Sequence, residues 1–296
     1  MIDLHLHTKH SDGTDSVKEL LENAENANLD IISITDHDSI DAYFDLEDEN
    51  LRNVFKGKII TGVEMKTHYN GIPIEVLGYG VDYNKLRIHK MPIYEIQVKA
   101  LEEFKERGRK LGLKFDENIS ISETDNMRKF ASFTFAQEIF KYEENLEILF
   151  SIGEKCDPAT FYRVHASNKK SVFYMDETVH YLSFKDTIDR IHEAGGLAFL
   201  AHPLLYPYEN DNKFEEIEKI LNEYNLDGLE CEYPLFSREE RDTLNSLCIK
   251  YNKFTSGGTD YHAKSKPNIN IGTGIDNNIN INNEYIDSWI NKVKLV

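Results

Sequence analysis

Short apolar runs alternate with amphipathic stretches along most of this 296-residue chain. Apolar runs bounded by turn residues are typical of buried strands, whereas apolar positions three and four residues apart are typical of helices. Strands that alternate with helices favour a parallel α/β sheet, which we expect to close, or nearly close, into a barrel. Seven runs are expected to form its strands: Ile2–Leu6, Asp30–Thr35, Lys58–Val63, Pro73–Gly80, Gly196–Ala201, Gly228–Cys231 and Phe254–Ser256.

The stretches that follow several of these runs have the spacing of amphipathic helices. One of them leads directly into Gly195 and Gly196, and glycine suits the left-handed residue that often ends a helix. The helices expected from this pattern are Asp15–Ala27, Phe184–Glu193, Lys213–Tyr224 and Glu239–Tyr251.

Residues 85–170 break this alternation. Helical periodicity is present at Ile96–Leu111 and Phe135–Phe150, but no apolar run occurs where the next strand would be expected. The sequence therefore predicts a first barrel segment at 1–84, a helical insertion at 85–170 and a second barrel segment at 171–296.

Composition and charge narrow the classes of partner. The hydrophobic fraction of 40% and the mean hydropathy of −0.52 indicate a globular chain with ample material for a core. The formal charge of −18 argues against long nucleic acids, whose backbones are bound by basic surfaces. It leaves room for a phosphate substrate, because bound cations can dominate the field inside one cleft.

The chain shows none of the common targeting or cysteine signatures. Its first residues contain no basic segment followed by an apolar one, and no stretch approaches the ~20 apolar residues of a membrane helix. Cys156, Cys231 and Cys248 are odd in number and widely spaced, which indicates neither a disulfide framework nor a thiolate zinc site. The sequence therefore predicts a cytoplasmic protein without a membrane partner, and it leaves the oligomeric state open.

Residues of the types that bind metals recur at the carboxyl ends of the expected strands. His5 and His7 are two apart at the end of the first run, so strand alternation points both to the same side. Barrel enzymes place their chemistry at this edge of the sheet. The other residues at this edge are Asp12, His37, Glu64, His202, Asp260 and His262.

Each of these pieces has an ordinary explanation when it is taken alone. A His-x-His pair on a strand is common, and Thr35-Asp36-His37-Asp38 is typical of a loop with a helix cap. The joint pattern is much harder to explain in this way, since five of the eleven histidines lie at strand ends together with Asp or Glu. We therefore interpret the whole set as a metal centre.

Several segments resemble, in order along the chain, the motifs of the PHP (polymerase and histidinol phosphatase) superfamily. The resemblance implies a distorted seven-stranded (β/α)7 TIM-like barrel with up to three metal ions and phosphoesterase activity. The Ser-Asp-Gly form of the second motif is similar to the branch that contains trinuclear nucleotide phosphatases and 5′-to-3′ exoribonucleases. The segments are Asp3-Leu4-His5-Leu6-His7-Thr8, Ser11-Asp12-Gly13, Ile34-Thr35-Asp36-His37-Asp38, Gly62-Val63-Glu64, Ala201-His202-Pro203 and Gly258-Thr259-Asp260-Tyr261-His262.

The resemblance also implies a ligand set, by position. Mixed histidine and carboxylate ligation suits two or three Mn²⁺, Fe²⁺ or Zn²⁺ ions, with Mg²⁺ as an alternative. A hydroxide between two ions would attack phosphorus in line, and a third ion would offset developing charge. The implied catalytic residues are Asp12, His37, His202, Asp260 and His262. The implied ligands are His5, His7, Glu64 and Asp260 for the first ion, Glu64 and His202 for the second, and Asp12, His37 and His262 for the third.

Two departures from the family pattern concern the second ion and the substrate. Relatives commonly have Ile-His-Ile-x-Gly where this chain has Ile74-Glu75-Val76-Leu77-Gly78, so Glu75 takes the place of a ligand. Glu75 is expected either to ligate the second ion, which would favour Mn²⁺ or Mg²⁺, or to remain a nearby carboxylate. An Arg-x-His pair of nucleotide-acting relatives aligns with Ser132 and Thr134. Substrate contacts are therefore assigned to Arg128, Ser132, Thr134, Arg163 and Lys169. The alternative for the three cationic side chains among them is that each is an ordinary solvated charge on the surface.

The leading hypothesis is hydrolysis of a small phosphate ester, with a nucleotide as the expected substrate. A helical cap over the cleft would suit a compact substrate. The alternatives are 5′-to-3′ exonuclease action on short oligonucleotides, histidinol phosphate hydrolysis, which the Ser-Asp-Gly signature disfavours, and a non-catalytic metal-binding module. Intact Asp12, His37, Asp260 and His262 argue against the last of these.

Overall fold

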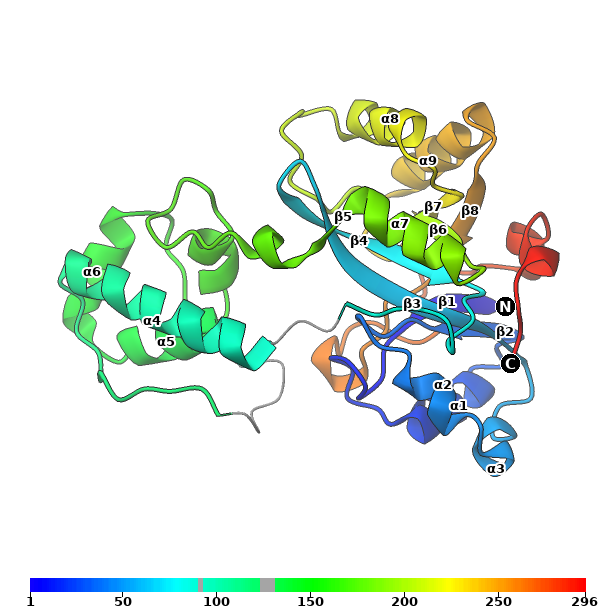
Figure 1. The fold of residues 1–296 in the computed structure, drawn as a ribbon, viewed down its shortest axis with the longest axis horizontal. Helices are drawn as coiled ribbons and strands as arrows, with labels where there is room; N and C mark the ends of the chain where they lie inside the picture. The colour runs from blue at the N-terminus through cyan, green and yellow to red at the C-terminus, as the bar shows by residue number, and fades with distance from the viewer. Residues whose placement is uncertain (90–92, 123–130) are drawn as a thin grey trace. The chain divides into compact units, whose positions relative to one another are not determined.

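A computed structural model describes residues 1–89, 93–122 and 131–296 of the chain (Figure 1). The chain divides into two compact units, one formed by Met1–His89 and Tyr181–Val296 and the other by Lys90–His180. Within the described ranges, no helix is both long and apolar enough to cross a membrane.

The first unit is built on a curled, mixed sheet of eight strands. Seven follow one another in the order β1-β2-β3-β4-β6-β7-β8, and the short β5 pairs with β3. Beyond the two ends of that order, His7 N donates to Tyr261 O at 2.9 Å and Tyr261 N donates to His5 O at 3.2 Å, which joins β1 to the segment after β8. The strands are β1 (Ile2–Leu6), β2 (Ile31–Ile34), β3 (Lys58–Tyr69), β4 (Ile72–Tyr79), β5 (Leu182–Ser183), β6 (Leu197–Leu200), β7 (Gly228–Glu232) and β8 (Phe254–Gly257).

The expectation of an all-parallel sheet is wrong at β4, which pairs antiparallel with both β3 and β6. The strand expected at Lys58–Val63 continues to Tyr69 and turns back through Asn70 and Gly71. Both turn residues have positive φ, 50° and 71°, as the tight two-residue turn of a hairpin requires. Because the connection is only two residues long, β4 has no crossover helix and must run in the opposite direction.

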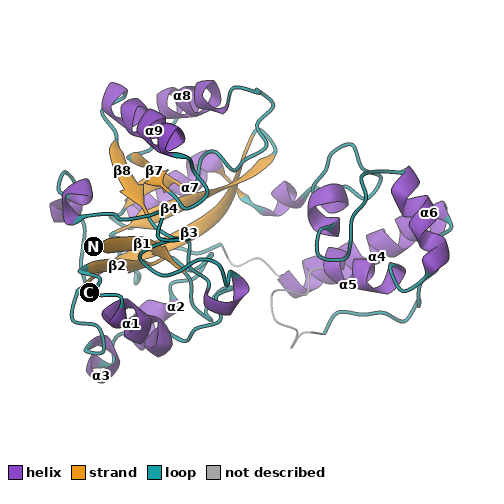
Figure 2. Cartoon of the chain, turned by 180° about the vertical axis from the view of Figure 1, so that it is seen from behind, coloured by secondary structure: helices purple, strands orange, loops and turns teal. Residues whose placement is uncertain are grey.

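Helices cover the sheet on two sides (Figure 2). Helices α1 and α2 pack near β1 and β2, whereas α7, α8 and α9 pack over β3, β4, β6 and β7. Helices α1 and α9 each begin with a capping box, at Ser16 and Ser237, which satisfies the first free backbone amides. The helices of this unit are α1 (Val17–Asn26), α2 (Asp41–Asp45), α3 (Glu49–Arg52), α7 (Phe184–Glu193), α8 (Lys213–Glu223), α9 (Arg238–Lys250) and the 3₁₀ turns η3 (Ala263–Ser265), η4 (Asn283–Ile286) and η5 (Ile290–Lys292).

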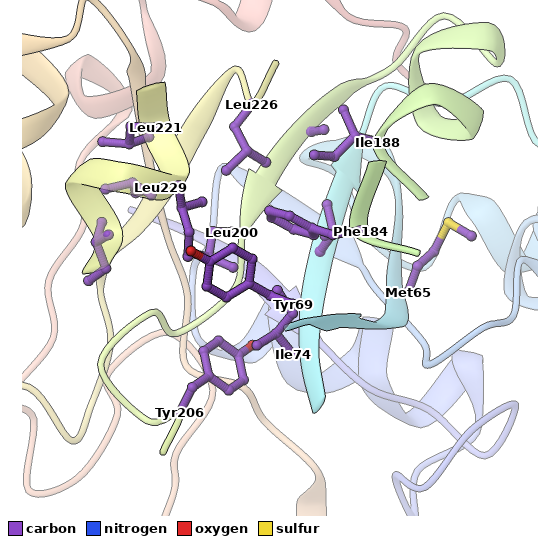
Figure 3. Packing of buried hydrophobic residues seen from close by; sticks show 14 of the residues in the cluster. Met65, Tyr69, Ile74, Phe184, Ile188, Leu200, Tyr206, Leu221, Leu226 and Leu229 are labelled. Carbon is purple, nitrogen blue, oxygen red and sulfur yellow. The ribbon is translucent and has the colours of Figure 1, made fainter. Parts of the chain in front are cut away.

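Apolar side chains on the outer face of the sheet pack against helices. This packing holds in place the strands whose carboxyl ends carry the histidines and carboxylates. Leu200 of β6 and Leu229 of β7 lie among side chains from α7 and α8, including Ile188 and Leu221 (Figure 3). At the other end of the chain, Trp289 stacks on Tyr79 with ring centroids 5.4 Å apart. The Asn- and Ile-rich tail therefore serves as packing for the sheet.

The second unit is helical and has its own core. Phe104, Phe135, Phe161 and Phe173 are buried there and contact one another through their rings. The single helical segment expected at Phe135–Phe150 is divided in two, because the chain turns after α5 and the side chain of Asn145 donates to Ile139 O at 2.8 Å. The elements are α4 (Ile93–Leu111), α5 (Ala131–Ile139), α6 (Glu143–Ser151), the π-helical turn η1 (Tyr162–Ala166) and the 3₁₀ turn η2 (Glu177–His180).

Candidate metal centre

Histidines and carboxylates from six strands or strand ends meet in the first unit. Three overlapping groups have ligand atoms that all lie within 4.8 Å of one another. Glu64 of β3 belongs to two of the groups and is fully buried. The groups are His5, His7, Glu64 and Asp260; His37, Glu64 and Glu75; and His7, Asp12, His37 and His262.

The first group surrounds one oxygen of Glu64. Glu64 Oε2 lies 3.1 Å from His5 Nε2 and 3.2 Å from His7 Nε2. Asp260 Oδ1 approaches the same two nitrogens at 3.6 and 3.3 Å. Among the described residues, His7 Nε2 is buried and has no partner in hydrogen-bonding geometry. Two nitrogens and two carboxylate oxygens that converge in this way offer a ready set of donors to one cation.

The second group lies between the end of β2, β3 and β4, and His202 from the end of β6 adjoins it. Glu64 Oε1 is 3.0 Å from His202 Nε2, and Glu75 Oε2 is 3.4 Å from the same nitrogen. His37 Nδ1 lies 3.2 Å from Glu64 Oε2 and 3.5 Å from Glu75 Oε1. The antiparallel hairpin explains the position of Glu75, since the register pairs it with Lys66 on the face that also carries Glu64.

The third group is the most accessible. Asp12 Oδ1 lies 3.0 Å from His262 Nε2 and 3.7 Å from His7 Nδ1, while Asp12 Oδ2 lies 3.8 Å from His37 Nε2. The side chain of Asp12 is 37% exposed, whereas that of His7 is fully buried. His7 and His37 each turn one ring nitrogen to this group and the other to a neighbouring group. This sharing goes beyond the ligand sets implied by the sequence, which placed each of the two histidines in one group.

The charges in the cluster favour the binding of cations. Burial alone would disfavour the imidazolium of His7, but the carboxylates of Asp260 and Glu64 raise its pKa to about 9. Burial, together with the charge of Glu64, raises the pKa of Glu75 to about 7. Four carboxylates in one partly buried site repel one another, and divalent ions would relieve that repulsion. The donor set and the buried ring nitrogens therefore fit metal ions.

Neighbouring residues hold the ligand-bearing segments in place. Both oxygens of Glu230 are used: Oε1 lies 2.8 Å from His5 Nδ1, and Oε2 accepts from His202 N at 2.7 Å. Asp36 accepts from Thr8 N at 2.7 Å and from Ser11 Oγ at 2.6 Å, which ties the loop after β1 to the loop after β2. Such outer contacts orient metal ligands and fix the histidine tautomer.

Three residues with positive φ lie at the same edge. His202, Asp260 and Ala263 have φ values of 25°, 56° and 53°, in a region that residues with a Cβ rarely adopt. Positive φ at such residues costs free energy and persists where the surrounding contacts hold it. Here those contacts aim ligand side chains at a common point.

Sequence reasoning missed two residues that contact Asp260. Tyr233 OH donates to Asp260 Oδ2 at 2.8 Å, and Lys266 Nζ donates to the same oxygen. Neither residue belongs to a motif, and nothing in the sequence pointed to Tyr233. The one sequence signal for Lys266 was its positive charge four residues after the last motif.

Those of the residues assigned to the substrate that the structure describes lie in the helical unit and do not gather at one place there. Arg128 lies outside the described residues. Ser132 lines a pocket of about 270 Å³ with Phe104 and Met175, whereas Thr134 lines a separate pocket with Ile119 and Lys141. Ser132 and Thr134 are two apart on α5, a rotation of about 200° around the helix axis, and so point to nearly opposite sides. Arg163 and Lys169 are exposed.

Comparisons with known proteins agree in family and in fold. A model of the PHP domain matches residues 3–234. A 5′-3′ exoribonuclease of Haemophilus influenzae is 26% identical over 88% of this chain and 89% of its own length. A 3′,5′-nucleoside bisphosphate phosphatase of Chromobacterium violaceum is 22% identical over 92% and 90%. The structure of a putative metal-dependent phosphoesterase of Bifidobacterium adolescentis is 19% identical, covers 99% of this chain and 96% of its own, and superimposes with a TM-score of 0.63.

Proposed function

The chain belongs to the PHP domain family, and on that premise we propose that it is a metal-dependent phosphoesterase that hydrolyses small phosphate esters. One observation carries the proposal: Glu64 Oε2 lies among the ring nitrogens of His5, His7 and His37, and Glu64 Oε1 faces His202. His7 and His37 turn their other ring nitrogens to Asp12, which links these ligands to a third group. A purely structural role would not require so many histidine nitrogens and carboxylate oxygens around one buried carboxylate, because burying charged groups costs free energy.

Each group has residues suited to one divalent ion. His5, His7, Glu64 and Asp260 would hold the first; Glu64, Glu75 and His202, with His37 Nδ1 nearby, the second; and Asp12, His37 and His262 the third. Two or three ions of Mn²⁺, Fe²⁺ or Zn²⁺, or Mg²⁺ in their place, suit these donors. Bound there, they would activate water for in-line attack on phosphorus and offset charge on the phosphoryl oxygens.

We assign a nucleotide as the substrate class. A relative of similar length is named for a nucleoside bisphosphate, and the charge of −18 disfavours long polyanions. The exoribonuclease name of the Haemophilus influenzae relative favours a second candidate, 5′-to-3′ exonuclease action on short oligonucleotides.

The experiment combines metal analysis with turnover. Protein purified without chelator is expected to contain two or three divalent ions per chain and to hydrolyse 4-nitrophenyl phosphate and a nucleoside 3′,5′-bisphosphate. Glu64→Gln should abolish both properties, while Glu239→Gln, an exposed change on α9, should alter neither. Undiminished hydrolysis by metal-free protein would refute the proposal.

The same experiment separates the alternatives. Processive release of nucleotides from a 5′-phosphorylated hexanucleotide, faster than bisphosphate hydrolysis, would favour the exonuclease. Bound metal without turnover of any ester would favour a non-catalytic metal-binding module.

A further inference from the structure

Lys266 is a cation that the fold places against the metal centre. It follows the turn η3, whose position is fixed by the loop that carries Asp12. Ser265 Oγ donates to Asp12 O at 3.1 Å, and Lys264 N donates to Thr14 Oγ1 at 2.9 Å. Lys266 N donates back to Ala263 O at 3.2 Å. The base of the Lys266 side chain is therefore held by the same segments as two candidate ligands, Asp12 and His262.

The ammonium group of Lys266 is charged and reachable from solvent. Its side chain is 38% exposed, whereas that of its partner Asp260 is 5% exposed. A lysine ammonium is charged at neutral pH, and contact with the Asp260 carboxylate favours the charged form. The ammonium therefore lies at the open side of the cluster, where Asp12 is also exposed.

Lys266 is not needed to orient Asp260. The hydroxyl of Tyr233 already donates to Asp260 Oδ2, and this leaves Asp260 Oδ1 directed at His5 and His7. An ammonium has three N–H donors, and Asp260 Oδ2 takes one of them. Asp260 does not use the other two donors, and the ammonium lies beside a site that would attract a phosphate once ions are bound.

We propose that Lys266 binds a terminal phosphoryl oxygen of the substrate and thereby favours dianionic phosphate monoesters over monoanionic diesters. This inference rests on the proposed phosphoesterase function and specifies its substrate class. Above a pH of about 6 a phosphate monoester carries close to two negative charges and a diester only one. A fixed cation beside the reacting phosphate attracts the dianion more strongly.

The test compares two esters in four proteins: wild type, Lys266→Met, Lys266→Arg and the neighbouring exposed control Lys264→Met. We expect Lys266→Met to lower kcat/KM for 4-nitrophenyl phosphate roughly 10- to 100-fold, the value of one charged hydrogen bond. The loss for bis(4-nitrophenyl) phosphate should be several-fold smaller. Lys266→Arg should recover part of the monoester rate, and Lys264→Met should match wild type. Metal content should be the same in all four proteins.

Binding of inorganic phosphate to the metal-loaded proteins, measured by calorimetry, is a second readout that does not depend on turnover. Lys266→Met should weaken it about as much as it lowers the monoester kcat/KM. If both esters lose rate equally while metal content falls, Lys266 only supports Asp260 and the inference is wrong. It is also wrong if phosphate affinity is unchanged. If wild type hydrolyses neither ester, the proposed function fails, and phosphate binding alone still decides the role of Lys266.

Discussion

Glu230 Oε1 lies 2.8 Å from His5 Nδ1, and both side chains are completely buried. This contact assigns the proton of His5 to Nδ1 and leaves Nε2 facing Glu64 and Asp260 as a donor for a metal ion. The second oxygen of Glu230 accepts from His202 N, so one carboxylate from β7 holds ligands of two different proposed ions.

We therefore predict that Glu230→Gln weakens metal binding more than it weakens the fold. An amide can still accept from His202 N, but it cannot stabilise His5 as a charged acceptor does. Loss of such an outer contact typically costs roughly 10- to 100-fold in metal affinity. Titration of metal-free protein with Mn²⁺ or Zn²⁺ measures the change. Glu232→Gln, two residues along the same strand but paired with Arg241, is the control and should bind metal normally. Equal affinities in all three proteins would contradict the role given to Glu230.

Much of this edge could be predicted because strands impose simple rules. His5 and His7 share a side through strand alternation, and residues that end neighbouring parallel strands meet at one edge. The runs around β1, β2, β6, β7 and β8 were recognisable from their apolar residues alone. These local rules place ligand residue types near one another without any knowledge of the side-chain packing.

Other features of the fold and the site could not be predicted from the periodic pattern of apolar residues. The reversal of β4 follows from Asn70 and Gly71, a pair that strongly favours a hairpin and that the apolar pattern of the strands does not indicate. Lys266 and Tyr233 reach Asp260 from irregular segments, where sequence spacing gives no direction. Ser132 and Thr134 were chosen by alignment, and the helical period separates them.

A second prediction concerns Asp12, which joins the third group from a loop. Asp12→Ala should lower kcat/KM by roughly 100-fold or more, since loss of even an outer contact has effects of that order. The fold should be nearly unaffected, because Asp12 is 37% exposed and lies outside the core. Steady-state kinetics and thermal unfolding of metal-free protein measure the two effects, with the exposed Asp41→Ala as control. Full activity would remove Asp12 from the site; a large loss of stability would show that it is structural.

A third prediction concerns the pH dependence of the helical unit. His165 is fully buried against Phe161 and Phe173, with Nδ1 3.1 Å from Ser171 Oγ. Burial lowers its pKa below the ordinary value. The unfolded chain therefore binds the proton more readily, so stability is lost as the pH falls below about 6.5.

Hydrogen exchange in α5 and η1, compared at pH 7.5 and pH 5 after correction for intrinsic rates, should show faster opening at pH 5. His165→Phe should reduce this difference, because its ring cannot be protonated. His180→Gln, at an exposed histidine of the same unit, should leave the difference as in wild type. The prediction would fail if all three proteins responded to pH alike.

The last prediction concerns Glu75, which stands where the family pattern has histidine. Its two oxygens lie 3.5 Å from His37 Nδ1 and 3.4 Å from His202 Nε2, the distances expected of residues that surround one ion. An anionic oxygen is a harder donor than an imidazole nitrogen, which favours Mn²⁺ or Mg²⁺ over Zn²⁺. It also neutralises part of the charge of the ion, so water activated at this site should release its proton at higher pH.

Glu75→His should shift the metal preference toward Zn²⁺ and lower the pH at which activity rises. The measurement is a pH–rate profile of both proteins with each reconstituted metal, and Glu216→His on α8 is the matched carboxylate-to-histidine control. Superimposable profiles and an unchanged metal order would show that Glu75 does not ligate the second ion, which would then depend on Glu64, His202 and His37 alone.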